Sequence, residues 1–309
     1  MSTLKHVICI GASLVDFNFN CFKNPVLNTS NPAAMSKSPG GVARNIAHHL
    51  SLLGCKVTLI TCEADDAEGK WLKEINASAG IDTSLSCRES KTGVYASIHD
   101  HLGNFHIGVV SSDVEDKLNA EFLSGVLSRI SEADLLIADC NLSVDSLKSL
   151  LDISEKRKWP VILDTVSVSK ASRIISALPA SVLMIKPNED EFRQFATESE
   201  SFYHEDEIFE FLHRKGVKNV WLSRGENDSI LSIGSDSFSL SAPSANIIDT
   251  NGAGDAAVAG WAYAFLQGKN IRECLQFGHA AAGAILESQG SVRPDMSTKL
   301  LEDYVKKLK

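Results

Sequence analysis

Residues 248–262 read Ile-Asp-Thr-Asn-Gly-Ala-Gly-Asp-Ala-Ala-Val-Ala-Gly-Trp-Ala, so a bare loop leads directly into an apolar segment. Gly252, Ala253 and Gly254 carry almost no side chain, and the residues after them are apolar on every side, which predicts a buried helix. A helix N-terminus that follows such a loop presents unpaired N–H groups and the positive end of the helix dipole, which suits an anion. Asp255 lies where these groups point. It could act on a neighbouring group as a base, or it could only stabilise the first helical turn.

A second glycine-rich stretch lies near the N-terminus, where residues 38–47 read Ser-Pro-Gly-Gly-Val-Ala-Arg-Asn-Ile-Ala. Apolar residues recur at helical spacing from position 42 to position 53, and Gly54 is typical of a helix C-terminus. Gly40 and Gly41 allow the backbone to approach a ligand closely, because neither carries a Cβ. Asn45 falls in the first turn of the predicted helix. The same pattern is also compatible with a simple tight turn between a strand and a helix.

Together, the two stretches resemble the two signatures of the PfkB (ribokinase-like) carbohydrate kinase family, and the resemblance covers essentially the whole chain. It implies a single kinase domain over residues 1–309. The N–H groups of residues 252–254 would form the anion hole, with Asp255 as the catalytic base. The same resemblance assigns Gly40, Gly41 and Asn45 to substrate binding.

Short apolar runs alternate with helical segments along most of the chain, which predicts an α/β fold with a doubly wound, mostly parallel sheet. Two strand-like segments, at about 16–38 and 92–110, lie outside this alternation. Phe17 and Phe19 alternate with polar residues, as in an edge strand. The resemblance implies that both segments form a small β-sheet lid that excludes water from the substrate and often pairs subunits, so a homodimer through the lid is expected.

Polar residues follow the predicted strands at their carboxyl ends, where ligands bind in open α/β sheets. Asp16 matches the family's substrate-gripping aspartate, although it could also be a solvated loop acid. Asp139 and Asn141 stand where many sugar kinases of the family have a glutamate, and we expect them to bind the substrate. Asp164-Thr165 replaces a common Asp-Pro pair.

The resemblance also predicts the nucleotide site. ATP is expected to contact six residues: Lys186, Asn188, Ser223, Gly225, Asn251 and Gly254. Asn188 and Glu191 would bind Mg²⁺ through its water shell, which suits an ion that keeps most of its waters; Asn188 could equally be an ordinary helix cap.

Two further features concern ions and charge near the phosphates. Asp249 and Ser291 would hold a monovalent cation such as K⁺, as in some family members. Asp228 stands where the nucleotide loop usually carries a second glycine; aspartate tolerates a left-handed backbone, but its charge would lie near the phosphates.

Composition excludes several other classes. The formal net charge of −9 has no basic block to offset it, which argues against nucleic acid or an acidic membrane surface as partner. The 7 cysteines are scattered without a Cys-x-x-Cys motif, as expected for reduced thiols of a cytoplasmic protein. The apolar run at residues 7–10 is too short for a signal or membrane segment. His99, His101 and His106 fall on one predicted hairpin, where exposed histidines are more common than a metal site.

The expected reaction is phosphoryl transfer from ATP to a primary hydroxyl group. The pattern at residues 30–32, 39–47, 138–141 and 163–167 is closer to the branch of the family that phosphorylates pseudouridine than to the ribokinase branch. The expected product is therefore pseudouridine 5′-phosphate. A ribokinase- or fructokinase-like sugar kinase and a non-catalytic binding protein are the alternatives.

Residues 16 and 45 suit a ribose diol, since a carboxylate accepts two hydroxyl protons and an amide adds a donor. These contacts with the ribose hydroxyls do not distinguish a nucleoside from a free pentose. Recognition of the base must come from polar groups elsewhere, and the candidates on the lid are Asn18, Asn28 and Thr29.

Overall fold

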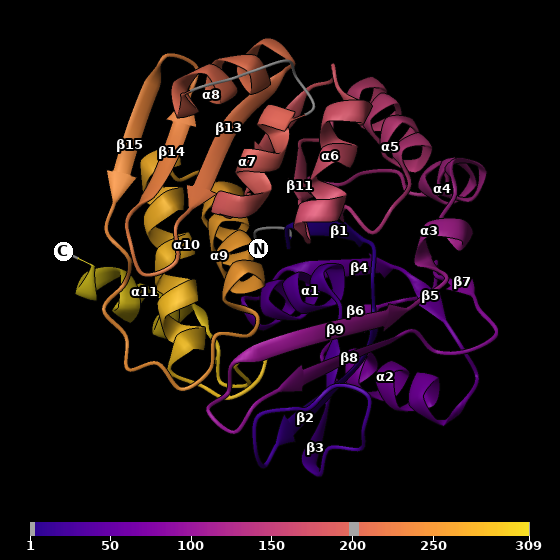
Figure 1. The fold of residues 1–309 in the computed structure, drawn as a ribbon. Helices are drawn as coiled ribbons and strands as arrows, with labels where there is room; N and C mark the ends of the chain where they lie inside the picture. The colour runs from indigo at the N-terminus through magenta and orange to yellow at the C-terminus, as the bar shows by residue number, and fades with distance from the viewer. Residues whose placement is uncertain (1–3, 198–203, 309) are drawn as a thin grey trace.

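The computed structural model describes residues 4–197 and 204–308, which form a layered α/β body with a small projecting sheet (Figure 1). The central sheet has nine strands in the order β15-β14-β13-β12-β11-β10-β1-β4-β6. Neighbouring strands from β13 through β6 are parallel, whereas β14 and β15 pair antiparallel at one edge. The strands are β1 (His6–Ile10), β4 (Lys56–Ile60), β6 (Ile81–Asp82), β10 (Leu135–Asp139), β11 (Val161–Asp164), β12 (Val182–Ile185), β13 (Val217–Ser223), β14 (Ser229–Ile233) and β15 (Asp236–Leu240).

Side chains of the central strands alternate between two apolar clusters, one on each face of the sheet. In β1, Ile8 and Ile10 pack into one cluster, while Val7 and Cys9 pack into the other. This double burial explains why the strands read as continuous apolar runs. Helices cover both faces: α3 (Val114–Lys117), α4 (Ala120–Leu127), α5 (Val144–Arg157), α6 (Val168–Ala177), α7 (Glu189–Thr197) and α8 (Glu205–Arg214) on one, and α1 (Val42–Leu52), α9 (Ala253–Leu266), α10 (Ile271–Leu286) and α11 (Thr298–Lys307) on the other.

The predicted doubly wound sheet is therefore confirmed, with one omission. The sequence analysis did not predict the β14–β15 hairpin, whose serine-rich strands lack the long apolar runs of the buried parallel strands. Helix α2 (Ala67–Ser78) and a short parallel pair, β5 (Cys62–Glu63) with β7 (Cys87–Arg88), complete the body. All 7 cysteines are buried free thiols.

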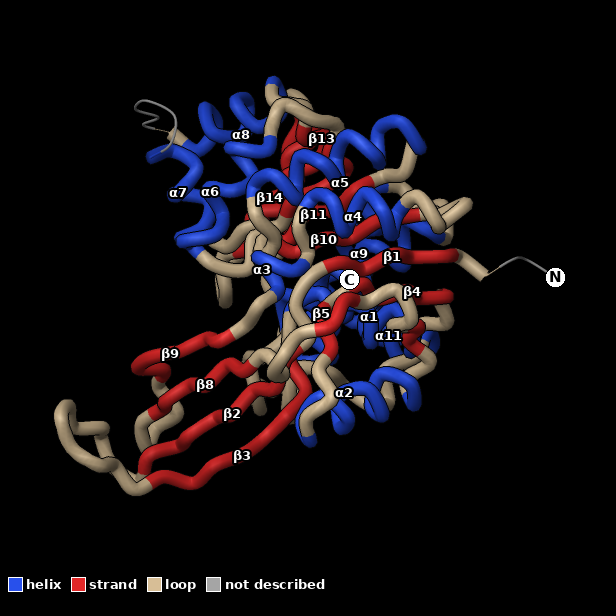
Figure 2. The backbone as a smooth tube through the Cα atoms, turned by 90° about the vertical axis from the view of Figure 1, so that its right-hand side faces the viewer, coloured by secondary structure: helices blue, strands red, loops and turns tan. Residues whose placement is uncertain are grey.

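The predicted small sheet is also confirmed, and it projects from the body as a four-stranded lid (Figure 2). Its strand order is β3-β2-β8-β9, so β2 is an inner strand and the expectation that Phe17 and Phe19 lie on an edge strand is wrong. The turn-rich segment before Gly40 contains a full strand that the sequence analysis did not separate. The lid strands are β2 (Leu14–Cys21), β3 (Ala33–Gly40), β8 (Val94–His99) and β9 (Phe105–Ser111).

The chain reverses its direction of travel across the sheet at β1, which lies between β4 on one side and β10 on the other. Such a switch point opens a crevice at the carboxyl ends of the strands, where α/β proteins bind ligands. The lid joins the body at this edge, because β2 begins only four residues after β1 ends. The fold therefore places the lid sheet beside the predicted site.

Candidate active site

The two glycine-rich stretches meet in space. Asn45, in the first turn of α1, donates a hydrogen bond from Nδ2 to Oδ2 of Asp255 at 2.8 Å, although 210 positions separate the two residues. Asp255 lies in the first turn of α9, directly after the predicted anion-hole loop. The helix it opens is buried on nearly every side, as predicted. One contact thus joins the predicted substrate loop to the predicted catalytic carboxylate.

Two of the glycines lie where an added Cβ would meet another segment of the chain. Gly252 has a φ of 74°, and a Cβ added there would lie 2.2 Å from the backbone oxygen of Ser291. A Cβ on Gly40 would lie 2.2 Å from the carboxylate oxygens of Asp16. The first glycine lets two backbone segments touch, and the second leaves room for the carboxylate that is expected to bind substrate.

The environment of Asp255 favours a role as a base. Burial raises the pKa of its carboxyl well above the usual range, and the charge of Asp164 adds to this rise. The hydrogen bond from Asn45 and the charge of Lys186 act in the opposite direction. A general base works best when its pKa lies near the working pH, so a raised aspartate pKa suits this chemistry.

Two more carboxylates at the site have raised pKa values. Burial raises the pKa of Asp16 to about 6, although Arg44 opposes the rise. Burial likewise raises the pKa of Asp164 to about 6, and here Lys186 opposes it. Clustered carboxylates with raised pKa values, each facing a cation, are typical of functional sites.

The carboxylate of Asp139 is bound by backbone N–H groups. Its side chain is buried with 1% exposure, and its carboxylate accepts hydrogen bonds from the backbone N–H groups of Ala12, Ala43 and Asn141 at 2.9, 3.1 and 3.0 Å. These bonds hold the segments that follow β1 and β10 against the start of α1 at the switch point. Contact between Asp139 and the substrate stays a prediction. Asn141 is half-buried, and its side-chain oxygen accepts a bond from Lys170.

The expected phosphate side of the site gathers around Lys186. Its Nζ lies 3.5 Å from Oγ of Ser223, and a Cβ on Gly254 would lie 3.6 Å from the same nitrogen. Gly225 adopts a φ of 60° and has open space around it. The structure therefore brings Lys186, Ser223 and Gly254 together, next to an open turn.

Asp228 does not act as the predicted substitute for a loop glycine. It has no positive φ; the neighbouring left-handed position belongs to Gly225. Its carboxylate is bonded to Oγ of Ser239 and to Nη1 of Arg224, at 2.5 and 3.4 Å. These partners hold its negative charge on the β14–β15 side of the loop.

Asn188 and Glu191 form a reciprocal cap at the start of α7. The backbone N–H of each donates to the side chain of the other at 2.9 Å, and Thr165 donates from Oγ1 to the Glu191 carboxylate at 2.6 Å. The capping alternative is therefore realised. Within residues 4–197 and 204–308, no group of three or more His, Cys, Asp or Glu side chains is placed to hold a metal ion. Asn188 and Glu191 nevertheless offer an amide and a carboxylate, and a hydrated Mg²⁺ needs few protein ligands.

The loops that carry Asp249 and Ser291 lie together. The Asp249 carboxylate accepts bonds from the backbone N–H groups of Asn251 and Gly290, each at 3.0 Å. The Ser291 hydroxyl lies 3.5 Å from Oδ1 of Asn45. Asn251 itself is exposed. Cation binding by Asp249 and Ser291 stays a prediction.

The lid histidines are engaged with their own hairpin. His99 contacts Oγ of Ser97 at 3.0 Å, and His106 contacts the carboxylate of Asp100 at 3.4 Å. His101 is exposed at the turn.

Sequence reasoning missed Arg44, whose side chain is completely buried beside Asn45. An arginine one position before the motif asparagine gives no sign of burial in the sequence, because charged side chains usually face solvent.

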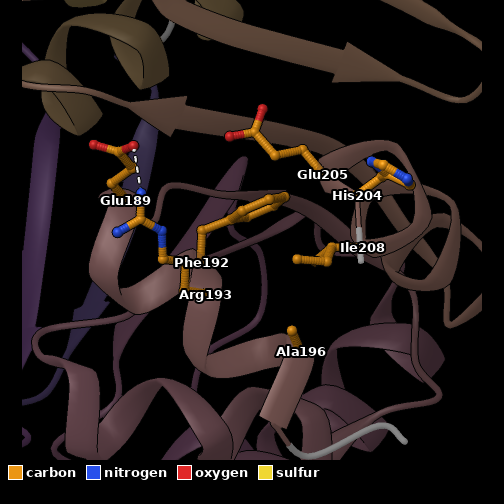
Figure 3. Close-up of a pocket in the computed structure, with 7 residues that line it drawn as sticks. All are labelled: Glu189, Phe192, Arg193, Ala196, His204, Glu205 and Ile208. Atoms are coloured by element: carbon orange, nitrogen blue, oxygen red, sulfur yellow. Dashed lines mark hydrogen bonds and ion pairs between the residues drawn. The ribbon is translucent and has the colours of Figure 1, made fainter. Parts of the chain in front are cut away.

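A separate cavity of about 180 Å³ lies between α7 and α8 (Figure 3). It is lined by Glu189, Phe192, Arg193, Ala196, His204, Glu205 and Ile208. None of the predicted site residues lines this cavity, so we assign it no part in phosphoryl transfer.

The sheet order, the helices on both faces and the small projecting sheet agree with a ribokinase-like fold. A model of the pfkB family carbohydrate kinases matches residues 4–299. The chain therefore belongs to this family, and it is a phosphotransferase that uses a hydroxyl group as acceptor.

Individual relatives agree with this assignment. The chain is 29% identical over 302 residues to the pseudouridine kinase of Escherichia coli (strain K12), with 96% of this chain and 95% of that protein covered. A carbohydrate kinase from Agrobacterium tumefaciens superposes with a TM-score of 0.81 at 26% identity, covering 98% of this chain and 97% of the other. Arabidopsis thaliana ribokinase complexed with ribose and ATP gives a TM-score of 0.76 at 21% identity, covering 99% of both chains.

Proposed function

We propose that this kinase transfers the γ-phosphoryl group of ATP to the 5′-hydroxyl of pseudouridine. The observation that carries the proposal is the 2.8 Å contact between Asn45 and Asp255, which supports a role for Asp255 as a base next to the loop expected to hold the ribose. The similarity to E. coli pseudouridine kinase over nearly the whole chain supports the choice of nucleoside.

In this proposal, Asp255 removes the hydroxyl proton as the oxygen attacks phosphorus. The N–H groups of Gly252, Ala253 and Gly254, together with Lys186, stabilise the negative charge that spreads over the transferred group. Asp16 accepts hydrogen bonds from the ribose diol. Asn141 lies at the neighbouring strand end and is proposed as a further substrate contact.

The nucleotide would lie over Lys186, Asn188, Ser223, Gly225, Asn251 and Gly254. When bound, Mg²⁺ would supply positive charge beside the phosphates, with Asn188 and Glu191 holding its waters. Asp249 and Ser291 would hold a monovalent cation behind the anion hole. Turnover that is unchanged when choline replaces potassium in the assay would contradict this last role.

Among the three lid candidates, we propose Asn18 as the residue that recognises the base. Asn18 lies two positions after Asp16 on β2, so both side chains point to the same face, about 7 Å apart along the strand. A ribose diol and the edge of its base are separated by a similar distance. Ser97 donates from Oγ to Oδ1 of Asn18 at 2.6 Å, which leaves the Asn18 amide N–H groups to face a carbonyl of uracil. Asn28 and Thr29, in contrast, are exposed in the loop between β2 and β3.

The test of the proposed function is a side-by-side measurement of kcat/KM for pseudouridine, uridine, cytidine, ribose and fructose. We expect pseudouridine to be the best substrate. Uridine should be rejected because it lacks the N1–H donor, and a site built to bind that donor discriminates strongly against its loss. If ribose or fructose equals or exceeds pseudouridine, the chain is a sugar kinase and the nucleoside assignment is wrong.

Replacing Asn18 with leucine should lower kcat/KM for pseudouridine about 10-fold or more, because a buried hydrogen bond to the base is lost. The value for ribose should change little, since a free pentose has no group at this position. Asn28→Ala is the matched control on the same lid and should leave both values unchanged. Equal losses for pseudouridine and ribose in Asn18→Leu would contradict a role in base recognition.

We also propose that the protein is a cytoplasmic homodimer paired through the lid. Large exposed apolar side chains gather there: Met35, Leu102, Phe105, Ile107, Val109 and Val110. Exposed apolar patches of this kind mark interaction surfaces. Sedimentation equilibrium should give a dimer for the native chain and a monomer for the double variant Ile107→Asp, Val109→Asp; an unchanged mass in the variant would exclude the lid as the interface.

No helix in the described ranges 4–197 and 204–308 is long and apolar enough to cross a membrane.

A further inference from the structure

The most unusual charged group near the site is Arg44, whose side chain has 0% exposure. Its guanidinium donates to three acceptors that carry no charge. Nε lies 3.2 Å from Oδ1 of Asn76, Nη1 lies 3.2 Å from Oδ1 of Asn45, and Nη2 lies 2.9 Å from Nδ1 of His48. His48 is a neutral acceptor, because burial and the nearby charge of Arg44 lower its pKa to about 3. Across the described part of the chain, no carboxylate forms a direct ion pair with Arg44.

A buried cation without a direct counter-charge is expensive, and an apolar side chain of similar volume usually stabilises such a position at least as well. Burial lowers the pKa of Arg44 to about 10, so the group still carries its charge at neutral pH. Packing alone therefore does not account for an arginine here.

The contacts of Arg44 lead to two groups of the proposed reaction. Because Nη1 donates to the Asn45 oxygen, the amide nitrogen of Asn45 must point the other way, toward Asp255. The Asp255 oxygen that receives this bond is thereby held in place. In addition, Arg44 is the cation that acts on Asp16.

We propose that Arg44 is a positioning residue for phosphoryl transfer, which holds the Asn45 amide against Asp255 and adds a positive charge that acts on Asp16. This inference rests on the proposed roles of Asp16, Asn45 and Asp255. Arg44 itself is separated from the substrate by Asn45, so it acts through its neighbours.

The test separates the geometric role from the charge with two variants, measured with pseudouridine and ATP. Arg44→Met removes both the hydrogen-bond donors of the guanidinium and its charge. It should lower kcat/KM for the nucleoside about 100-fold, because a misplaced catalytic group slows the reaction strongly. Arg44→Lys keeps the charge but cannot reach all three acceptors, so kcat should fall about 10-fold.

The pH profile of pseudouridine affinity, measured by calorimetry, is the readout that a merely structural role would not change, because Asp16 is proposed to bind the nucleoside whereas Asp255 acts in the chemical step. The titratable or charged groups that face Asp16 in the described structure are Arg44 on α1 and Tyr95 on β8, and burial raises the pKa of Tyr95 so that it stays neutral. Loss of the Arg44 charge raises the pKa of Asp16 further. The acidic limb in Arg44→Met should therefore move to higher pH by about one unit, while Arg44→Lys should keep the native limb.

Asn76→Ala tests the positioning role without changing Arg44 itself, because it removes one acceptor of the guanidinium and leaves Arg44 in place. It should lower kcat several-fold with an unchanged acidic limb. Arg157→Gln is the control: Arg157 contacts the backbone oxygen of Ile130 on the far side of the body, and its loss should change neither readout.

Folded Arg44→Lys and Asn76→Ala proteins with native kcat would overturn the proposal, whether or not Arg44→Met folds. An Arg44→Met enzyme with reduced activity but the native acidic limb would overturn the charge role. Asp255→Asn is measured in parallel to distinguish failure of the proposed base from failure of the Arg44 role. Full activity of Asp255→Asn would refute the proposed base. If Asp255→Asn loses activity while the Arg44 variants keep native activity, only the role of Arg44 is refuted.

Discussion

Replacing Asp255 with asparagine should lower kcat by about 10²–10⁴, the usual contribution of a general base. The fold should survive, because asparagine is nearly isosteric and its side-chain oxygen can still accept the bond that Asn45 donates at 2.8 Å. The helix that begins at this loop is held by its buried apolar residues and does not depend on the carboxylate. The loss should therefore appear in the chemical step, with ATP and nucleoside binding largely kept.

The measurement is steady-state turnover with pseudouridine, accompanied by thermal unfolding. Asp152→Asn, an exposed aspartate on α5, is the matched control and should retain native activity. In the native enzyme, burial and Asp164 raise the pKa of Asp255. Because only the ionised form accepts a proton, turnover should fall as the pH drops through this raised pKa. A variant that retains more than a tenth of native turnover would rule out Asp255 as the base.

The parts of the site that were predictable from sequence are those that depend on local backbone requirements. Gly252 permits a close approach of two backbone segments that no other residue allows, so it is visible in the sequence as a glycine. The buried strands were predictable for a similar reason, since burial on both faces leaves an uninterrupted apolar run. Each of these signals is contained in a few consecutive residues.

Other contacts of the site residues depend on partners far away in the chain. The carboxylate of Asp139 accepts hydrogen bonds from backbone N–H groups of segments 96 and 127 positions distant and from its own turn. The burial of Arg44 gave no signal in the sequence, because its acceptor Asn76 lies on a different helix. No spacing rule reports such contacts, because they exist only after the sheet has assembled.

Asn188 and Glu191 illustrate a third case, in which one spacing serves two purposes. A cap and the residue three positions later form the same pattern whether they start a helix or hold the waters of an ion. The structure shows the cap. Magnesium dependence measured in variants of Glu191 distinguishes a role in holding the waters of the ion from a role in capping α7 alone.

Replacing Gly254 with valine should reduce turnover by about 10²–10³, comparable to the loss of a donor at a developing charge. Gly254 is the second residue of α9 and has no positive φ, so a side chain there does not strain the backbone. A Cβ at this position would lie 3.6 Å from Nζ of Lys186, which is an ordinary contact. The two methyl groups of valine would, however, fill the space between the helix start and Lys186 where the transferred phosphate is expected to lie.

Binding of the nucleoside should be largely kept in Gly254→Val, because Asp16 and Asn45 approach the site from the lid and α1. Gly254→Ala is the graded control: its Cβ fits beside Lys186, and alanine favours a helix over glycine by about 1 kcal/mol, so stability should not fall and turnover should drop less. Gly252→Ala differs, since its Cβ would meet the Ser291 backbone at 2.2 Å and should destabilise the whole loop. Calorimetry with pseudouridine and kinetics with varied ATP separate these outcomes. If a folded Gly254→Val protein loses nucleoside affinity as strongly as turnover, the loop does not face the phosphate. The proposed positions of ATP and the nucleoside would then be exchanged.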